Sequence, residues 1–184
     1  MPRRKTIDDD KVLDGAARVM FSTGPDFTLS EVAAETGLAP ATLLQRFGTK
    51  HDLVVRVIER ENARFEAMLK TRPKAKGAKH VVDLVGELSK IFDEDDQGDE
   101  FLWLREDIRD PDLNVLARAR FKLTHDAVAA RMPDMKIARP DATRLLLAVW
   151  HGAVVQWSFE RKGRLTTYVK RSVILWFLAC GVKV

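Results

Sequence analysis

The sequence predicts an all-α protein with an N-terminal three-helix head and a C-terminal helical body, about nine helices in total. Apolar residues recur at helical spacing along most of the 184 residues. Glycine, proline and short polar segments separate these periodic stretches. Residues 26–53 also show two short helical patterns on either side of a glycine-containing turn. Together these observations favour a helical protein organised around that stretch.

The two short helices of residues 26–53 have clear start and stop signals. The first is expected to begin near Ser30, with Thr28 or Ser30 as its N-cap. It is expected to end at Gly37, because glycine adopts the left-handed conformation without steric cost. Pro40 suits the first turn of the second helix, where its missing N–H would have no partner. A helix, a tight turn and a second helix form a helix-turn-helix, which places its second helix in the DNA major groove.

Ten positions in this stretch carry a more specific pattern. They are Thr28, Val32-Ala33, Gly37-Leu38, Thr42-Leu43, Phe47, Lys50 and Leu53. In this order the stretch resembles the DNA-binding segment of the tetracycline-repressor (TetR) family, which runs roughly T-x-x-x-(I/V)-A, G-(V/L), x-T-L-Y, F, (S/N)-K and L. Leu44 departs from the family, which usually has an aromatic residue there, and Thr49 stands at the Ser/Asn position.

The resemblance implies a double-stranded DNA operator as partner, read as a pseudo-palindrome by a symmetric dimer. By position, the base- and groove-facing residues are Ser30, Pro40, Ala41, Thr42 and Gln45. The residues at backbone-contact positions are Thr28, Leu44, Arg46 and Lys50. A glutamine can bind adenine through two hydrogen bonds, and the Ala41 and Thr42 methyl groups can contact a thymine methyl group.

Composition limits the remaining possibilities. The hydrophobic content is 46% and the charged content 32%, as in globular proteins. No apolar run reaches 18 residues and the N-terminus has no apolar signal segment, so we expect a cytoplasmic protein that does not enter the membrane. The single cysteine, Cys180, excludes an internal disulfide bond and fits a reducing compartment. The net charge of +4 is weak evidence for DNA binding, since residues 1–72 contain 12 Lys or Arg against 11 Asp or Glu.

The rest of the chain is expected to be helical. The other predicted helices cover about residues 8–21, 50–69, 80–92, 101–109, 113–132, 140–161 and 165–180. The acidic run at 93–100 lacks the spacing of an EF-hand loop and is predicted to be a solvated loop. We place a DNA-binding domain at 1–52, followed by a ligand-binding and dimerisation domain at 53–184 that the helix of residues 50–70 connects to it.

The last two helices, at about 140–161 and 165–180, are apolar on nearly all sides. Their own domain cannot cover that much apolar surface, which argues for a second chain. Gly152 would allow another helix to approach closely. The arrangement resembles the C-terminal helix pair through which the family forms homodimers.

The resemblance also implies a cavity for a small effector between the helices of the body. Candidate residues from separate helices are Phe65, Leu88, Trp103, Phe121, His125, Trp150 and Val154. Large aromatic side chains with few polar atoms suit an apolar or aromatic ligand, and His125 would be its polar contact. The alternative is that these side chains only fill the core.

By this resemblance the protein is a ligand-responsive transcriptional regulator, most often a repressor. Two alternatives stay open: a regulator of the same fold controlled by a protein partner, and a helical enzyme. The four histidines are isolated in the sequence, and no H-E-x-x-H motif, Cys/His cluster or glycine-rich phosphate loop occurs. The sequence therefore predicts no catalytic residues, no metal site and no cofactor. It leaves open the effector, the operator sequence and whether the protein represses or activates.

Overall fold

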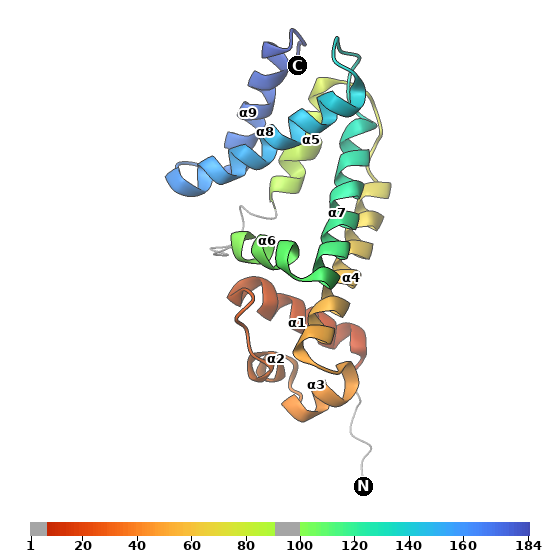
Figure 1. Cartoon of the computed structure of the whole chain (residues 1–184), viewed down its shortest axis with the longest axis vertical. Helices are drawn as coiled ribbons and strands as arrows, with labels where there is room; N and C mark the ends of the chain where they lie inside the picture. The colour runs from red at the N-terminus through yellow and green to blue at the C-terminus, as the bar shows by residue number, and fades with distance from the viewer. Residues whose placement is uncertain (1–6, 91–99) are drawn as a thin grey trace. The chain divides into compact units, whose positions relative to one another are not determined.

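The computed structural model describes residues 7–90 and 100–184, and all regular secondary structure in these ranges is helical (Figure 1). The helices are α1 (Asp9–Thr23), α2 (Leu29–Thr36), α3 (Pro40–Phe47), α4 (Lys50–Lys70), α5 (Ala78–Ser89), α6 (Glu100–Arg109), α7 (Pro111–Ala129), α8 (Arg139–Glu160) and α9 (Leu165–Ala179). This confirms the predicted all-α class. The acidic run expected to be a loop lies outside the described residues up to position 99, and Glu100 begins α6. No helix in the described ranges is long and apolar enough to cross a membrane.

The chain divides into two compact units. Unit 1 comprises Met1–Ala67 and Gln97–Arg120, and unit 2 comprises Met68–Asp96 and Phe121–Val184. Both α4 and α7 therefore contribute residues to both units. The boundary expected from the sequence lies after residue 52, whereas the first compact unit also includes α4 up to Ala67, α6 and the start of α7.

Unit 1 is built on one apolar core that all of its helices share. Its buried members include Met20 of α1, Val32 of α2, Phe47 of α3 and Leu53 of α4, together with Phe27 from the loop before α2. Burying one such large side chain contributes about 1.5–3 kcal/mol to the free energy of unfolding. This core holds the three short N-terminal helices on the first turns of α4.

Close packing of α1 against α2 depends on one small residue. A Cβ atom placed on Gly15 would lie 2.6 Å from Cγ2 of Thr36. Real side chains do not approach so closely, so any larger residue at position 15 would force the Thr36 side chain to shift. Charged side chains join α1 to α4 as well: Arg60, whose side chain is only 15% exposed, is paired with Asp10 at 3.2 Å and Asp14 at 2.8 Å.

The helix-turn-helix follows the predicted start and stop signals. The Thr28 hydroxyl accepts a hydrogen bond from the Glu31 N–H at 3.2 Å, and the Glu31 carboxylate accepts one from the Thr28 N–H at 2.6 Å. This reciprocal capping box satisfies two backbone donors at the start of α2. Gly37 has φ 69° and ψ 19°, the left-handed conformation that ends α2, and Pro40 is the first residue of α3.

Unit 2 has a second core, formed by α5, α8 and α9. Buried residues include Val81 and Val85 of α5, Leu146 of α8, and Val173 and Phe177 of α9. A buried hydrogen bond from Trp150 Nε1 to the Ser89 hydroxyl, 2.9 Å long, joins α8 to the last residue of α5. The core thus leaves the other faces of α8 and α9 available for further contacts.

Candidate nucleic-acid interface

The second helix of the motif, α3, exposes most of the residues predicted to read DNA. Pro40, Ala41, Leu44 and Gln45 are exposed, and Thr42 is half-buried. The opposite side of α3 is anchored, because Leu43 and Phe47 are buried in the unit 1 core. A short helix fixed on one side and exposed on the other has the form that a major groove accepts.

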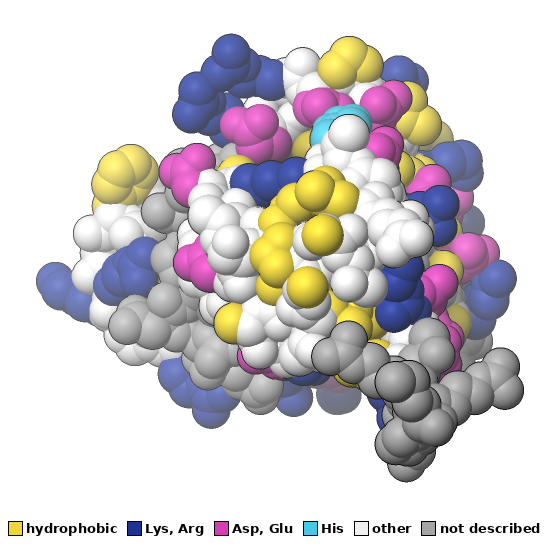
Figure 2. All heavy atoms as spheres, turned by 90° about the horizontal axis from the view of Figure 1, so that it is seen from below, with side chains coloured by type: hydrophobic (Ala, Val, Ile, Leu, Met, Phe, Trp, Pro, Cys, Tyr) yellow, Lys and Arg dark blue, Asp and Glu magenta, His cyan; other side chains and the backbone are white. Residues whose placement is uncertain are grey.

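The exposed face of α3 is apolar rather than basic. Leu44 is 47% exposed, so it does not fill the core. Figure 2, which views this end of the molecule, shows hydrophobic side chains gathered near the middle of the face and Lys or Arg side chains beside them. Apolar groups at the centre of the face suit contact with base edges and thymine methyl groups, and the basic groups suit phosphates.

The structure gives the two predicted basic contacts a second role within the protein. The Arg46 guanidinium donates a hydrogen bond to the Ile7 carbonyl at 2.8 Å and is paired with the Asp9 carboxylate. The Lys50 ammonium donates to the Pro25 carbonyl at 2.9 Å and lies 4.3 Å from the centre of the Phe27 ring. Both cations therefore hold segments of the head together.

The N-termini of α2 and α4 are capped in the same way. Thr49 accepts a hydrogen bond from the Asp52 N–H at 3.1 Å, and the Asp52 carboxylate accepts one from the Thr49 N–H at 2.7 Å. Hydrogen bonds from the capping threonines lower the pKa of both Glu31 and Asp52. Among the predicted DNA contacts, Ser30 is exposed in the first turn of α2, while the Thr28 hydroxyl is used in the cap.

The seven candidate effector residues fall into both units. Phe65 and Trp103 belong to unit 1, while Leu88, Phe121, His125, Trp150 and Val154 belong to unit 2. Trp103 packs against the unit 1 core, where its Nε1–H donates to the Met20 carbonyl at 3.2 Å and its ring meets Phe21 edge to face. These contacts give Trp103 a packing role in unit 1.

In unit 2 the aromatic candidates form a small cluster around a histidine that the sequence did not single out. The His151 ring centre lies 5.8 Å from that of Phe121 and 5.5 Å from that of Trp150. Desolvation by neighbouring groups lowers the pKa of His151 below its ordinary value of 6.5, although the residue is exposed at the surface. The sequence offered one signal for His151, its position directly after the candidate Trp150. The candidates Phe121 and His125 are four residues apart on α7, at helical spacing.

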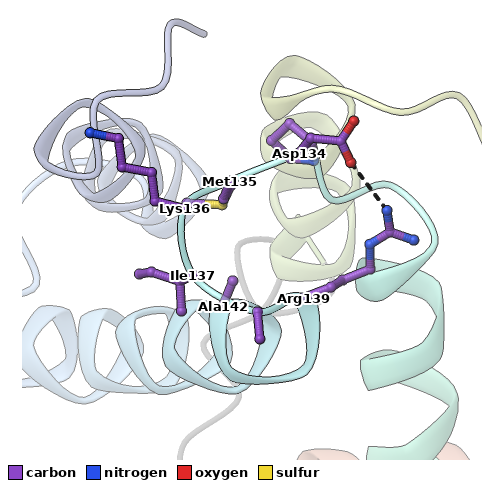
Figure 3. Close-up of a pocket in the computed structure, with 8 residues that line it drawn as sticks. Asp134, Met135, Lys136, Ile137, Arg139 and Ala142 are labelled. Carbon is purple, nitrogen blue, oxygen red and sulfur yellow. Dashed lines mark hydrogen bonds and ion pairs between the residues drawn. The ribbon is translucent and has the colours of Figure 1, made fainter.

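The described surface includes two open depressions that none of the seven candidates lines. The first, about 560 Å³, lies over the loop from Pro133 to Ala138 and the start of α8 (Figure 3). There Asp134 is paired with Arg139 at 3.3 Å. The second, about 500 Å³, lies in unit 1 beside Arg46, Asp52 and Arg56. Neither depression has the enclosed, mostly apolar lining that suits a small organic ligand.

Tertiary structure also brings together a group that the sequence did not indicate. The His51 ring of α4 lies between Asp110 and Asp112, 3.5 Å and 3.1 Å away. One ligand atom from each side chain lies within 4.8 Å of the other two, so the spacing would admit a cation, but each carboxylate is already paired with its own ring nitrogen. The aspartates follow His51 by about 60 residues, which is why spacing alone gave no signal.

An anchored, reciprocally capped helix-turn-helix that exposes one face of its second helix defines a DNA-binding protein of the helix-turn-helix class. Residues 12–57 match a family model described as "Bacterial regulatory proteins, tetR family". No curated protein matches the chain in sequence. This match assigns residues 12–57 to the DNA-binding segment of the TetR family, and together with the fold it supports a DNA-binding transcriptional regulator.

Solved structures agree on the fold over nearly the whole chain. A TetR transcription regulator from Haloarcula marismortui has a TM-score of 0.71 at 15% identity, covering 94% of this chain and 95% of that one. FadR from Bacillus subtilis, in complex with stearoyl-CoA, has a TM-score of 0.64 at 14% identity, covering 95% and 100%. The multidrug binding protein EbrR, complexed with ethidium, has a TM-score of 0.61 at 25% identity, covering 89% and 95%.

Proposed function

We propose that the protein is a ligand-responsive repressor that binds a pseudo-palindromic operator as a homodimer. The observation that carries this proposal is the exposed face of α3, with Pro40, Ala41 and Gln45 on a helix anchored by Leu43 and Phe47. In this proposal Gln45 reads a base, and the capped N-terminus of α4 faces a phosphate. Two such heads would enter successive major-groove faces about 34–36 Å apart, or a small multiple of one helical turn.

In this proposal the homodimer interface is formed by the outer faces of α8 and α9. Apolar residues at helical spacing remain exposed there: Leu145, Val155 and Phe159 on α8, and Leu175 and Leu178 on α9. Phe159 is 87% exposed, and single chains rarely expose such rows of large apolar residues. An isologous interface, in which the same face of each chain meets its copy, would cover them.

Gly152 lies on the same face of α8 as Leu145 and Phe159, seven residues from each. A Cβ atom at Gly152 would meet no other atom within 4 Å, so the single chain has room for a side chain there. In this proposal the glycine is needed only where the partner helix approaches. Gly152→Leu should therefore leave the monomer folded and yield monomers in sedimentation velocity, whereas Gly152→Ala should retain most dimer. A Gly152→Leu protein that stays dimeric would place the interface elsewhere.

For the effector we propose a small apolar or aromatic molecule that contacts the ring cluster of unit 2. Phe121 is 50% exposed and can still cover a ligand, and the lowered pKa of His151 favours its uncharged form near pH 7. Val154 lies one turn beyond Trp150 on α8, and His125 one turn beyond Phe121 on α7. Stearoyl-CoA in FadR has a long apolar acyl chain and ethidium in EbrR is aromatic, which supports the proposal without identifying the ligand.

The protein would dissociate from its operator if the effector bound more tightly to a conformation in which the spacing of the two heads does not match the operator. Since α4 and α7 each contribute residues to both units, they are the continuous helical connections through which such a change can pass. A coupling free energy of roughly 1–3 kcal/mol would weaken operator binding about 5- to 150-fold.

The most informative experiment is selection of genomic fragments bound by the purified protein, followed by footprinting of the best fragment. Two protected half-sites at the expected spacing would support the proposal, whereas a single half-site or no sequence preference would contradict it. Genes beside the operator would indicate the effector chemistry. Calorimetry with candidate compounds, set beside pull-downs, then separates control by a small molecule from control by a protein partner.

A further inference from the structure

His51 connects two segments that are distant in the sequence. It is the second residue of α4, directly after Lys50. Its Nε2 lies 3.1 Å from the Asp112 carboxylate in the first turn of α7. Its Nδ1 lies 3.5 Å from the carboxylate of Asp110, which stands between α6 and α7. The ring thus bridges the first turn of α4 and the α6–α7 corner, both within unit 1.

The bridge is complete only when the ring carries two protons. A neutral imidazole has one N–H and one lone pair, so one of the two carboxylates would face the lone pair. The imidazolium ion donates from both nitrogens and can satisfy both carboxylates at once. Asp110 cannot easily turn away, because its other oxygen caps α7 by accepting the N–H groups of Asp112 and Leu113, each at 3.0 Å.

The charges around the ring agree with this geometry. The hydrogen bond to Asp112 raises the pKa of His51 above its ordinary value of 6.5; burial opposes the increase, and the charges of Asp110, Asp112 and Asp52 reinforce it. Because the folded-state pKa of His51 is raised, the bridge contributes fully to stability at any pH below the unfolded-state pKa. The contribution is then lost as pH rises through the folded-state pKa, which lies above 6.5.

We propose that His51 is a positioning residue for DNA binding, whose protonated ring fixes the first turn of α4 against the α6–α7 corner. That turn carries Lys50 and the Thr49 cap, and its N-terminus is the end that would face a phosphate. Loss of the proton releases one side of the bridge and lowers operator affinity. The other three histidines, His80, His125 and His151, belong to unit 2, so His51 is the histidine that responds within unit 1.

The test measures fluorescence anisotropy of the ligand-free full chain on its selected operator, at fixed ionic strength, from pH 6.0 to 8.5. Wild-type affinity should fall roughly three- to tenfold over this range, the scale of one or two partly exposed ion pairs. His51→Arg, which stays charged and has several donors, should bind tightly at every pH. His51→Gln should bind weakly at every pH, and His80→Gln in unit 2 should keep the wild-type slope.

Asp112→Asn separates positioning from a simple effect of charge near DNA. Removing a negative charge would strengthen DNA binding if charge alone mattered. The bridge predicts the opposite: the Asp112→Asn protein should bind DNA more weakly, and its affinity should fall at a lower pH than that of the wild type. Thermal melting of each variant checks that it is folded. An NMR titration of the His51 ring needs no DNA, so failure of the bridge and failure of operator binding can be told apart.

Four results would overturn the proposal. The first is a His51→Gln protein that keeps the wild-type pH slope, and the second is an Asp112→Asn protein that binds more tightly. The third is a His51 ring that titrates at or below its ordinary value. Micromolar Zn²⁺ that restores tight binding at pH 8.5 in the wild type, but not in His51→Gln, would also overturn it, because the cluster would then serve a metal ion.

Discussion

Lys50 occupies a position where the family resemblance implies a contact with DNA, yet its ammonium group already has partners inside the head. It donates to the Pro25 carbonyl at 2.9 Å and lies 4.3 Å from the centre of the buried Phe27 ring. It therefore ties the loop before α2 to the start of α4. Lys50→Met keeps a similar apolar stem and removes the ammonium group, so it tests this tie directly.

The size of the effect follows from the two contacts. A hydrogen bond from a charged donor contributes about 1.5–3 kcal/mol, and a cation–π contact contributes about 0.5–2 kcal/mol. Lys50 is half-buried and one ammonium group makes both contacts, so the values are not simply added. We expect the free energy of unfolding to fall by about 1.5–3 kcal/mol.

Urea unfolding of the wild type, Lys50→Met and Lys74→Met provides the measurement. Lys74 is exposed in the loop after α4, so Lys74→Met is a matched control that should unfold like the wild type. The salt dependence of DNA binding gives an independent measurement, since each lost phosphate contact reduces the slope of log affinity against log salt by about 0.9. Lys50→Met should weaken binding with its slope unchanged. Unchanged stability together with a slope reduced by one contact per head would refute the internal role and assign Lys50 to a phosphate.

Three further predictions concern the head. Gln45→Ala should cost roughly 1–3 kcal/mol on the best operator and relax one base preference, and equal weakening on all sequences in a binding-site selection would exclude base reading. Because Leu44 is 47% exposed, the Leu44→Tyr protein should fold normally. It should bind specific and non-specific DNA more tightly by about 0.5–1.5 kcal/mol, the value of one hydrogen bond to a phosphate. A lower melting temperature without tighter binding would contradict this prediction. The lowered pKa values of Glu31 and Asp52 mean that their caps stabilise the head above the unfolded carboxyl pKa and lose this effect as pH falls through the folded one. Melting temperature should therefore fall more steeply between pH 5 and 3 in the wild type than in Glu31→Gln, and parallel curves would argue against the cap.

The sequence predicted the helix-turn-helix because the signals that begin and end short helices are local. Thr28 and Glu31 are three residues apart and form the capping box, and Gly37 adopts the left-handed conformation expected after a helix. Pro40 begins α3 as expected, and Pro111 likewise begins α7. The register of the family pattern then assigned the exposed face of α3, where the DNA-reading roles of the individual residues remain predictions.

The contacts of long side chains were decided only by the tertiary structure, because such side chains reach partners that lie far away in the sequence. Arg46 reaches Ile7, Trp103 reaches Met20 in the unit 1 core, and His51 is placed between two aspartates about 60 residues away. Helical periodicity shows which face of a helix is apolar, but it cannot show which other helix covers that face. The sequence by itself therefore determined the helices, the ends of the two helices of the helix-turn-helix and the class of DNA-binding motif. Packing determined which charged groups hold the head together and which candidate effector residues share a compact unit.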